Sequence, residues 1–187
     1  MATEDGSKPT GKSRLVGLHI VATPIGNLRD ITLRAIDTLS EVDVIACEDT
    51  RVTAKLLSAH DIRTPMTAYH EHNAARVLPG MIKRLQNGET MALVSDAGTP
   101  LISDPGYRLV RAARDAEIPV TSEPGPSATL TALVLSGLPS DRFLFAGFLP
   151  NKSAGRKRAL ADYLNIDATL LFLESTRRLP ASLSDMA

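Results

Sequence analysis

Cysteine is almost missing from this sequence of 187 residues, which contains only Cys47. One cysteine can form no disulfide within the chain and cannot supply a cysteine cluster for zinc. Cys47 ends the apolar run 42–47, where we expect a small buried side chain rather than a catalytic thiol. No apolar run is long enough to span a bilayer, and residues 1–14 lack the apolar segment of a signal peptide. We therefore expect a cytoplasmic protein that does not enter a membrane.

Excess charge and the common nucleotide motifs are also missing. Lys and Arg number 21, as do Asp and Glu, so any affinity for nucleic acid must come from a local basic patch. No GxGxxG follows the first apolar run, which excludes the dinucleotide fingerprint, and no GxxxxGK[ST] is present, which excludes a P-loop enzyme. The hydrophobic content of 43% and the charged content of 22% are ordinary for a globular protein.

Short apolar runs alternate with amphipathic segments along most of the chain. We predict strands at 15–22, 42–46, 91–94 and 119–122, and helices at 30–39, 51–60, 74–86, 106–116 and 130–135. Asp30 is the expected N-cap of the first helix, whose apolar residues Leu33, Ile36 and Leu39 have helical spacing. This alternation is typical of βαβ units and predicts an α/β fold with a mostly parallel sheet flanked by helices.

A second unit is expected to begin near residue 140. The apolar run 143–148 follows Pro139, and beyond it lie a predicted helix near 156–164 and a predicted strand at 168–173. We divide the chain into a disordered polar tail at 1–14, an N-terminal α/β domain at 15–140 and the beginning of a second α/β domain at 141–187. Two strands are too few for independent stability, so the second unit either packs on the first or is incomplete.

Three of the predicted strands end in turns rich in glycine and proline, at 23–27, 95–106 and 124–128. Ligands of open α/β sheets bind outside the carboxyl ends of the strands, where glycine allows close approach to the main chain. Each turn alone could be a simple connection, since Gly and Pro are common in turns. Because all three are expected on one edge, and 95–106 is long for a connection, we predict a ligand site there.

Polar side chains follow two other strands at the same edge. Glu48 and Asp49 end the second strand, where they could act as a general base or hold substrate, although Asp49 could instead cap the next helix. His70 and His72 lie on alternate sides of an extended segment without a suitable third ligand, so we expect no metal site.

A basic segment near residue 156 has two possible roles. Lys152, Arg156, Lys157 and Arg158 have no acidic residue among them between 150 and 161, so they could contact phosphates or form a solvated helix face.

Four motifs in order resemble the ribosomal RNA small subunit methyltransferase I family, within the wider tetrapyrrole methylase (class III) superfamily. They are 23–32 (TPIGNLRDIT), 47–51 (CEDTR), 95–106 (SDAGTPLISDPG) and 124–128 (PGPSA). The resemblance covers residues 15 to about 179 and implies a two-domain α/β enzyme with S-adenosylmethionine between the domains. It also implies a homodimer that methylates the ribose 2′-hydroxyl of a cytidine in 16S rRNA of the small ribosomal subunit.

The resemblance carries functional residues onto the loops of this chain. By the family pattern, the cofactor-binding candidates are Pro24, Ser95, Asp96, Ile102, Ser127, Ala128, Glu174 and Ser175, to which we add Gly26, Ala97 and Gly98 from the same loops. A ribose hydroxyl is a weak nucleophile near neutral pH, so a base would assist its attack on the sulfonium methyl. Glu48, Asp49 and His70, in that order, are the candidate bases.

Two alternatives to the ribosomal reaction stay open at this point. Within the superfamily, the chain could methylate a carbon of a corrin or porphyrin. Family members also continue well past this sequence, so we expect an N-terminal fragment, which could be a non-catalytic module that only binds nucleotide.

Overall fold

The computed structural model describes residues 15–187, so the tail predicted at 1–14 lies outside the described residues. The elements follow one another as β1 (Leu18–Val21), η1 (Leu28–Asp30), α1 (Leu33–Glu41), β2 (Val44–Cys47), α2 (Thr50–Ala59), β3 (Met66–Ala68), α3 (Glu71–Gln86), β4 (Met91–Val94), α4 (Tyr107–Asp115), β5 (Val120–Glu123), α5 (Ala128–Ser136), β6 (Phe143–Phe148), α6 (Ser153–Ala161), β7 (Thr169–Leu173) and α7 (Leu179–Met186).

The first unit is built on a five-stranded sheet with the order β3-β2-β4-β1-β5. All four neighbouring pairs are parallel, which confirms the predicted parallel sheet. In the register of these pairs Cys47 lies beside Val94, and Val21 beside Glu123. The carboxyl ends of β1, β2, β4 and β5 therefore meet at one edge, where the predicted ligand loops begin.

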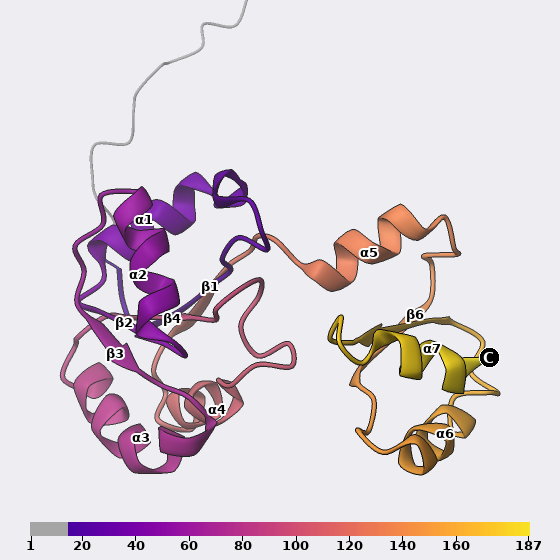
Figure 1. Ribbon diagram of the computed structural model, residues 1–187. Helices are drawn as coiled ribbons and strands as arrows, with labels where there is room; N and C mark the ends of the chain where they lie inside the picture. The colour runs from indigo at the N-terminus through magenta and orange to yellow at the C-terminus, as the bar shows by residue number, and fades with distance from the viewer. Residues whose placement is uncertain (1–14) are drawn as a thin grey trace, which may run out of the picture.

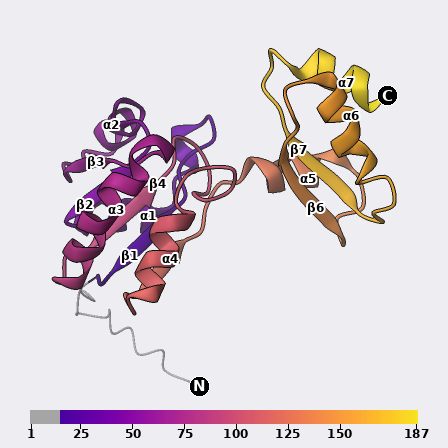
Figure 2. The same ribbon diagram turned by 90° about the horizontal axis from the view of Figure 1, so that it is seen from below.

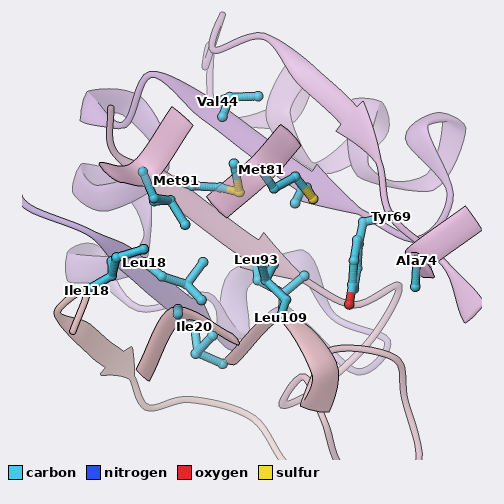
Figure 3. Packing of buried hydrophobic residues seen from close by; sticks show 13 residues of the cluster. Leu18, Ile20, Val44, Tyr69, Ala74, Met81, Met91, Leu93, Leu109 and Ile118 are labelled. Carbon is cyan, nitrogen blue, oxygen red and sulfur yellow. The ribbon is translucent and has the colours of Figure 1, made fainter. Parts of the chain in front are cut away.

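Helices cover both faces of this sheet, α3 and α4 on one face and α1 and α2 on the other (Figure 1). Figure 3 shows the α3/α4 side, where Leu109 of α4 packs with Leu18 and Leu93 of the central strands. On the opposite face Leu39 of α1 packs with Ile45 of β2. Because strands β2 and β4 are buried on both faces, their sequences are continuous apolar runs rather than alternating ones, and β1 departs from such a run only at the buried His19.

The second unit contains a two-stranded parallel sheet of β6 and β7 with helices α6 and α7. It is joined to the first unit through α5, which lies between the two sheets (Figure 2). None of the residues in β6 or β7 is fully buried. The domain boundary predicted near residue 140 falls in the connection between α5 and β6 and stays a prediction.

Arg156 departs from both roles considered for the basic segment, while Lys152, Lys157 and Arg158 are exposed. Its side chain is buried, with Nε donating to Asp185 Oδ2 at 2.7 Å and Nη1 to the carbonyl of Pro150 at 3.3 Å. Asp185 belongs to α7, far along the chain from the basic segment. Its Oδ1 also lies 3.7 Å from the Lys157 ammonium. Arg156 therefore ties α6 to α7 and is not available to phosphates.

Several expected elements differ in detail from the structure. Thr32, not Asp30, is the N-cap of α1: its hydroxyl accepts the Ala35 N–H at 3.1 Å, while Asp30 ends a short 3-10 helix. Leu33, the first residue of α1, is exposed, whereas Leu39 on the same helix is buried. The sequence analysis did not assign bounds to β3, which is short and half-buried, and missed α7. Cys47 is buried as expected, and burial raises the pKa of its thiol.

Candidate active site at the carboxyl edge of the parallel sheet

Hydrogen bonds tie the three glycine- and proline-rich loops to one another. Thr23, just after β1, and Gly98, after β4, exchange backbone hydrogen bonds of 2.9 and 3.0 Å. The Thr23 hydroxyl also donates to the Ser95 carbonyl at 3.1 Å. The Thr99 hydroxyl donates to the carbonyl of Pro126, in the loop after β5, at 3.2 Å. The loops are thus one connected surface rather than three separate turns.

The loop after β4 is conformationally strained. Leu101 and Ser103 both have positive φ values, of 73° and 61°, which side-chain-bearing residues rarely adopt. Leu101 packs against the core on the α3/α4 side. A Cβ on Gly106, whose φ is 144°, would lie 2.9 Å from Leu93 Cδ2 and 3.0 Å from Leu101 Cδ1. The missing side chain of Gly106 therefore makes the space in which Leu101 anchors the loop. Strain of this kind is often found at functional sites.

A cavity of about 250 Å³ opens between these loops and the second unit. Its lining residues are Ile25, Ala97, Gly98, Thr99, Ile102, Ser103, Asp104, Ser127, Ala128, Thr129, Phe148 and Leu173. The strand β6 approaches the loop closely, since a Cβ on Gly147 would lie 3.3 Å from Ser103 Oγ. The cavity combines apolar side chains from both units with hydroxyl groups, backbone and one carboxyl group.

Five residues predicted from the sequence line this cavity: Ala97, Gly98, Ile102, Ser127 and Ala128. Ser127 is the N-cap of α5, with its hydroxyl accepting the Leu130 N–H at 3.4 Å. Helix geometry leaves the next backbone N–H groups without intrahelical partners, so they can serve a ligand.

The other predicted cofactor residues lie around the cavity rather than on it. Pro24, Ser95 and Asp96 line a neighbouring hollow of about 180 Å³, closed on its far side by α2. Gly26 has a φ of 142° and open space where a Cβ would stand. Glu174 follows Leu173 and is held inside the second unit, where its Oε2 accepts the Ser182 hydroxyl at 2.6 Å and lies 3.1 Å from Arg178 Nη2. The adjacent Ser175 N–H donates to Glu174 Oε1 at 2.7 Å. Their roles toward a cofactor stay predictions.

Several lining residues were not predicted from the sequence, most notably Asp104. This residue was included in the loop 95–106 but not selected, because nothing in the sequence distinguishes it from Asp96. Phe148 and Leu173 were missed because their approach depends on how the second unit sits on the first. The signal that could have indicated Asp104 is its place in a loop with unusual length and glycine content.

Carboxyl groups gather where β2 and β4 end. The pKa of Glu48 is raised, first by burial and then by Asp96 and Asp104, while His70 lowers it. The pKa of Asp104 is also raised, first by burial and then by Asp96, against a hydrogen bond with Ser95 that lowers it. This edge of the sheet therefore holds two carboxyl groups that are stronger bases than free ones.

Asp49 behaves differently from these two groups. Its carboxylate accepts Arg51 Nε at 3.0 Å and Arg51 Nη2 at 2.6 Å, and these contacts lower its pKa to about 2. It also accepts the backbone N–H of Arg51 at 2.8 Å as the N-cap of α2, the alternative role considered for it. Asp49 is thus a weak base, and its own N–H is held by Asp96 Oδ1 at 3.2 Å.

His70 follows β3 and precedes α3. Its backbone N–H donates to Asn73 Oδ1 at 2.9 Å, and its ring lies edge-on to His72 with a centroid distance of 6.1 Å. It lies close enough to Glu48 to lower the pKa of that carboxyl group. Within residues 15–187, no three His, Cys, Asp or Glu side chains are grouped so that they could hold a metal ion. No helix in that same range has the length and apolarity to cross a membrane.

The class of protein to which this chain belongs is a family of methylases. The model of the tetrapyrrole (corrin/porphyrin) methylases matches residues 17–187, and the chain belongs to this family. Among solved structures, diphthine synthase aligns over 90% of this chain and 72% of its own with a TM-score of 0.66 at 15% identity. Uroporphyrin-III-C-methyltransferase from Thermus thermophilus aligns over 78% of this chain and 73% of its own, with a TM-score of 0.56 at 21% identity. At these identities the two structures support the fold alone.

Sequence relatives are more specific. The chain is 59% identical to ribosomal RNA small subunit methyltransferase I of Mesorhizobium japonicum, over 90% of this chain and 58% of that protein. It is 53% identical to the protein of the same name from Haemophilus influenzae, over 90% of this chain and 60% of that one. The chain thus spans about three fifths of the length of these curated relatives.

Proposed function

We propose that this chain carries the methyl-donor site of a methyltransferase that uses S-adenosylmethionine. The proposed acceptor is the ribose 2′-hydroxyl of a cytidine in 16S rRNA. The observation that carries the proposal is the cavity between the tied loops, on which five of the residues expected to bind cofactor converge. The identity of 59% to a relative named for methylation of ribosomal RNA favours the acceptor.

The residues present fit a nucleoside ligand with a charged amino-acid tail. Ile25, Ile102, Phe148 and Leu173 supply apolar surface for a base and ribose. A side chain on Gly98 would point between Ile25 Cγ2, at 3.4 Å, and the Pro126 carbonyl, at 3.8 Å, so glycine keeps this part of the site open. The cavity of about 250 Å³ is slightly below the usual range for ligand pockets, roughly 300–1,000 Å³. A complete cofactor would therefore extend past it along the loops.

The chemistry that the donor supplies is an electrophilic methyl group on a positively charged sulfur. The protein must hold the acceptor oxygen in line with that group, so that orientation provides much of the acceleration. The proton acceptors proposed from the sequence are Glu48, Asp49 and His70, none of which lines the cavity. Among these three, burial raises the pKa of Glu48 while Arg51 keeps Asp49 ionised.

The proposal also implies a place and partners. A protein that methylates 16S rRNA works in the cytoplasm on the small ribosomal subunit. A second copy of the chain is the other proposed partner, and apolar side chains on α5 support it: Leu130, Val134 and Leu135 are 50%, 74% and 79% exposed. Sedimentation of the purified protein would measure the dimer directly.

The deciding experiment is mass spectrometry of rRNA from cells that lack the gene. Loss of one ribose methyl from 16S rRNA, restored by the gene, supports the proposal. Unchanged rRNA together with methylation of a tetrapyrrole precursor would favour the corrin or porphyrin alternative. The chain spans 58% of the length of this relative. If the protein binds the methyl donor but transfers no methyl group to either acceptor, the non-catalytic alternative is favoured.

A further inference from the structure

Asp104 occupies a singular place in the proposed donor site. Among the described residues that line the cavity, it alone has an ionisable side chain. Its neighbours on the lining are hydroxyl-bearing, apolar or glycine residues, and Glu48, Asp49 and His70 do not line it. Asp104 is therefore the one residue of this lining whose side chain can carry a charge beside a bound ligand.

The backbone of the loop that carries Asp104 is strained. Ser103, directly before Asp104, and Leu101, three residues before it, both have positive φ values, and Leu101 is fixed by its packing over Gly106. Ser95, at the end of β4, is near enough to the carboxyl group to lower its pKa. Backbone strain that orients one side chain into a cavity is typical of a site whose geometry serves chemistry.

The charges around Asp104 make it a better base than a free carboxylate. Burial disfavours the ionised form, and Asp96 in the same loop repels its negative charge. Both effects raise the pKa of the carboxyl group, which makes it a stronger base than a free carboxylate.

We propose that Asp104 accepts the proton of the acceptor hydroxyl during methyl transfer, an inference that rests on the proposed function. The oxygen forms a bond to the methyl carbon with one of its lone pairs, and the carbon–sulfur bond breaks with its electron pair passing to sulfur. The proton leaves the oxygen for the Asp104 carboxylate, and its bonding pair stays on the oxygen. A cation and an anion are thereby replaced by a neutral sulfide and a neutral carboxylic acid. The neighbouring cation favours the ionised carboxylate before transfer, and its loss favours the protonated form afterwards.

The first test compares Asp104→Asn with wild type on small ribosomal subunits from cells lacking the gene, with a radioactive methyl donor. We expect the turnover to fall on the order of 100-fold or more, and the rise of kcat/KM with pH to disappear. Asp104→Glu, which keeps a carboxylate, should retain that rise. Asp115→Asn is the matched control, because Asp115 is 72% exposed on α4 and should transfer methyl like wild type.

The second readout does not depend on turnover. Calorimetry should show Asp104→Asn binding the positively charged donor about 3- to 10-fold more weakly, with affinity for the neutral demethylated product within about 2-fold of wild type. If Asp104→Asn has the same ratio of the two affinities as wild type, or the same turnover and pH profile as an active wild type, the proton-acceptor role of Asp104 is overturned. The proposed function is not affected by either result. A Glu48→Gln variant that loses transfer while Asp104→Asn keeps it would do the same and assign the proton to Glu48. If wild type itself transfers no methyl to ribose, the proposed function fails and the proton-acceptor role fails with it.

Discussion

Gly106→Ala is predicted to damage both the stability of the chain and its donor site. The added Cβ would stand 2.9 Å from Leu93 Cδ2 and 3.0 Å from Leu101 Cδ1, inside the packed core where Leu93 is 1% exposed. Overpacking of this kind costs about 1–3 kcal/mol. Forcing alanine to a φ of 144° costs about 1–3 kcal/mol more. The expected loss is therefore about 2–6 kcal/mol, or about 4–24 °C in Tm for a chain of this size.

The matched control for this change is Gly137→Ala. Gly137 also has a positive φ, of 69°, but no heavy atom lies within 4 Å of the place where its Cβ would stand. This variant should lose only the conformational cost of about 1–2 kcal/mol. Denaturant titration followed by circular dichroism measures both free energies of unfolding, and calorimetry measures donor affinity, which should fall only for Gly106→Ala. Equal losses of stability in the two variants would refute the reasoning that Leu101 is anchored over Gly106.

Three further predictions follow from single contacts. Thr32→Ala should lower the free energy of unfolding by about 1 kcal/mol in denaturant titration, because it removes the side-chain cap of α1, whereas Asp30→Ala should change it little. Cys47 should react with a thiol reagent only as fast as the chain unfolds, since its thiol is buried with a raised pKa; rapid labelling of the native protein would contradict this. Asp104→Asn should have a Tm at pH 7 equal to or above that of wild type, because a carboxyl group with a raised pKa in the folded state is less favourable there when it is ionised. The difference in Tm should vanish below the ordinary carboxyl pKa of 3.8, where the group is protonated in both the folded and the unfolded chain. A lower Tm of Asp104→Asn at pH 7 would contradict the raised pKa.

Much of the first unit could be predicted from the sequence because its three central strands, β1, β2 and β4, are buried on both faces. Runs such as 91–94 are continuous and apolar, and each is followed by an amphipathic segment, so the alternation indicated a parallel sheet before its strand order was known. The bounds of the strand Met66–Ala68 could not be predicted because the strand is short and half-buried at the sheet edge. The cap of α1 was misplaced because Asp30 and Thr32 are both good N-cap residues, and only the backbone conformation distinguishes them.

Features that depend on contacts between distant segments were beyond the sequence. The partner of Arg156 is Asp185, on a helix that showed no clear signal, so the basic segment looked unopposed. The loops at 95–106 and 124–128 were selected correctly as one surface, since parallel strands bring their carboxyl ends together. The prominence of Asp104 arises from the strain at Leu101 and Ser103 and from the second unit closing over the loop, and neither is visible in local patterns.

The claim that the cavity holds the methyl donor can be tested by filling it. Ala128 lines the cavity at the start of α5 and is exposed to it, so Ala128→Leu should occupy the space without disturbing the core. Ala132→Leu adds the same bulk to an exposed position of the same helix away from the lining and serves as the control. In calorimetry with S-adenosylmethionine, the account predicts that wild type and Ala132→Leu bind alike and that Ala128→Leu binds at least about 10-fold more weakly. Equal binding by all three proteins, or no binding by wild type, would contradict it.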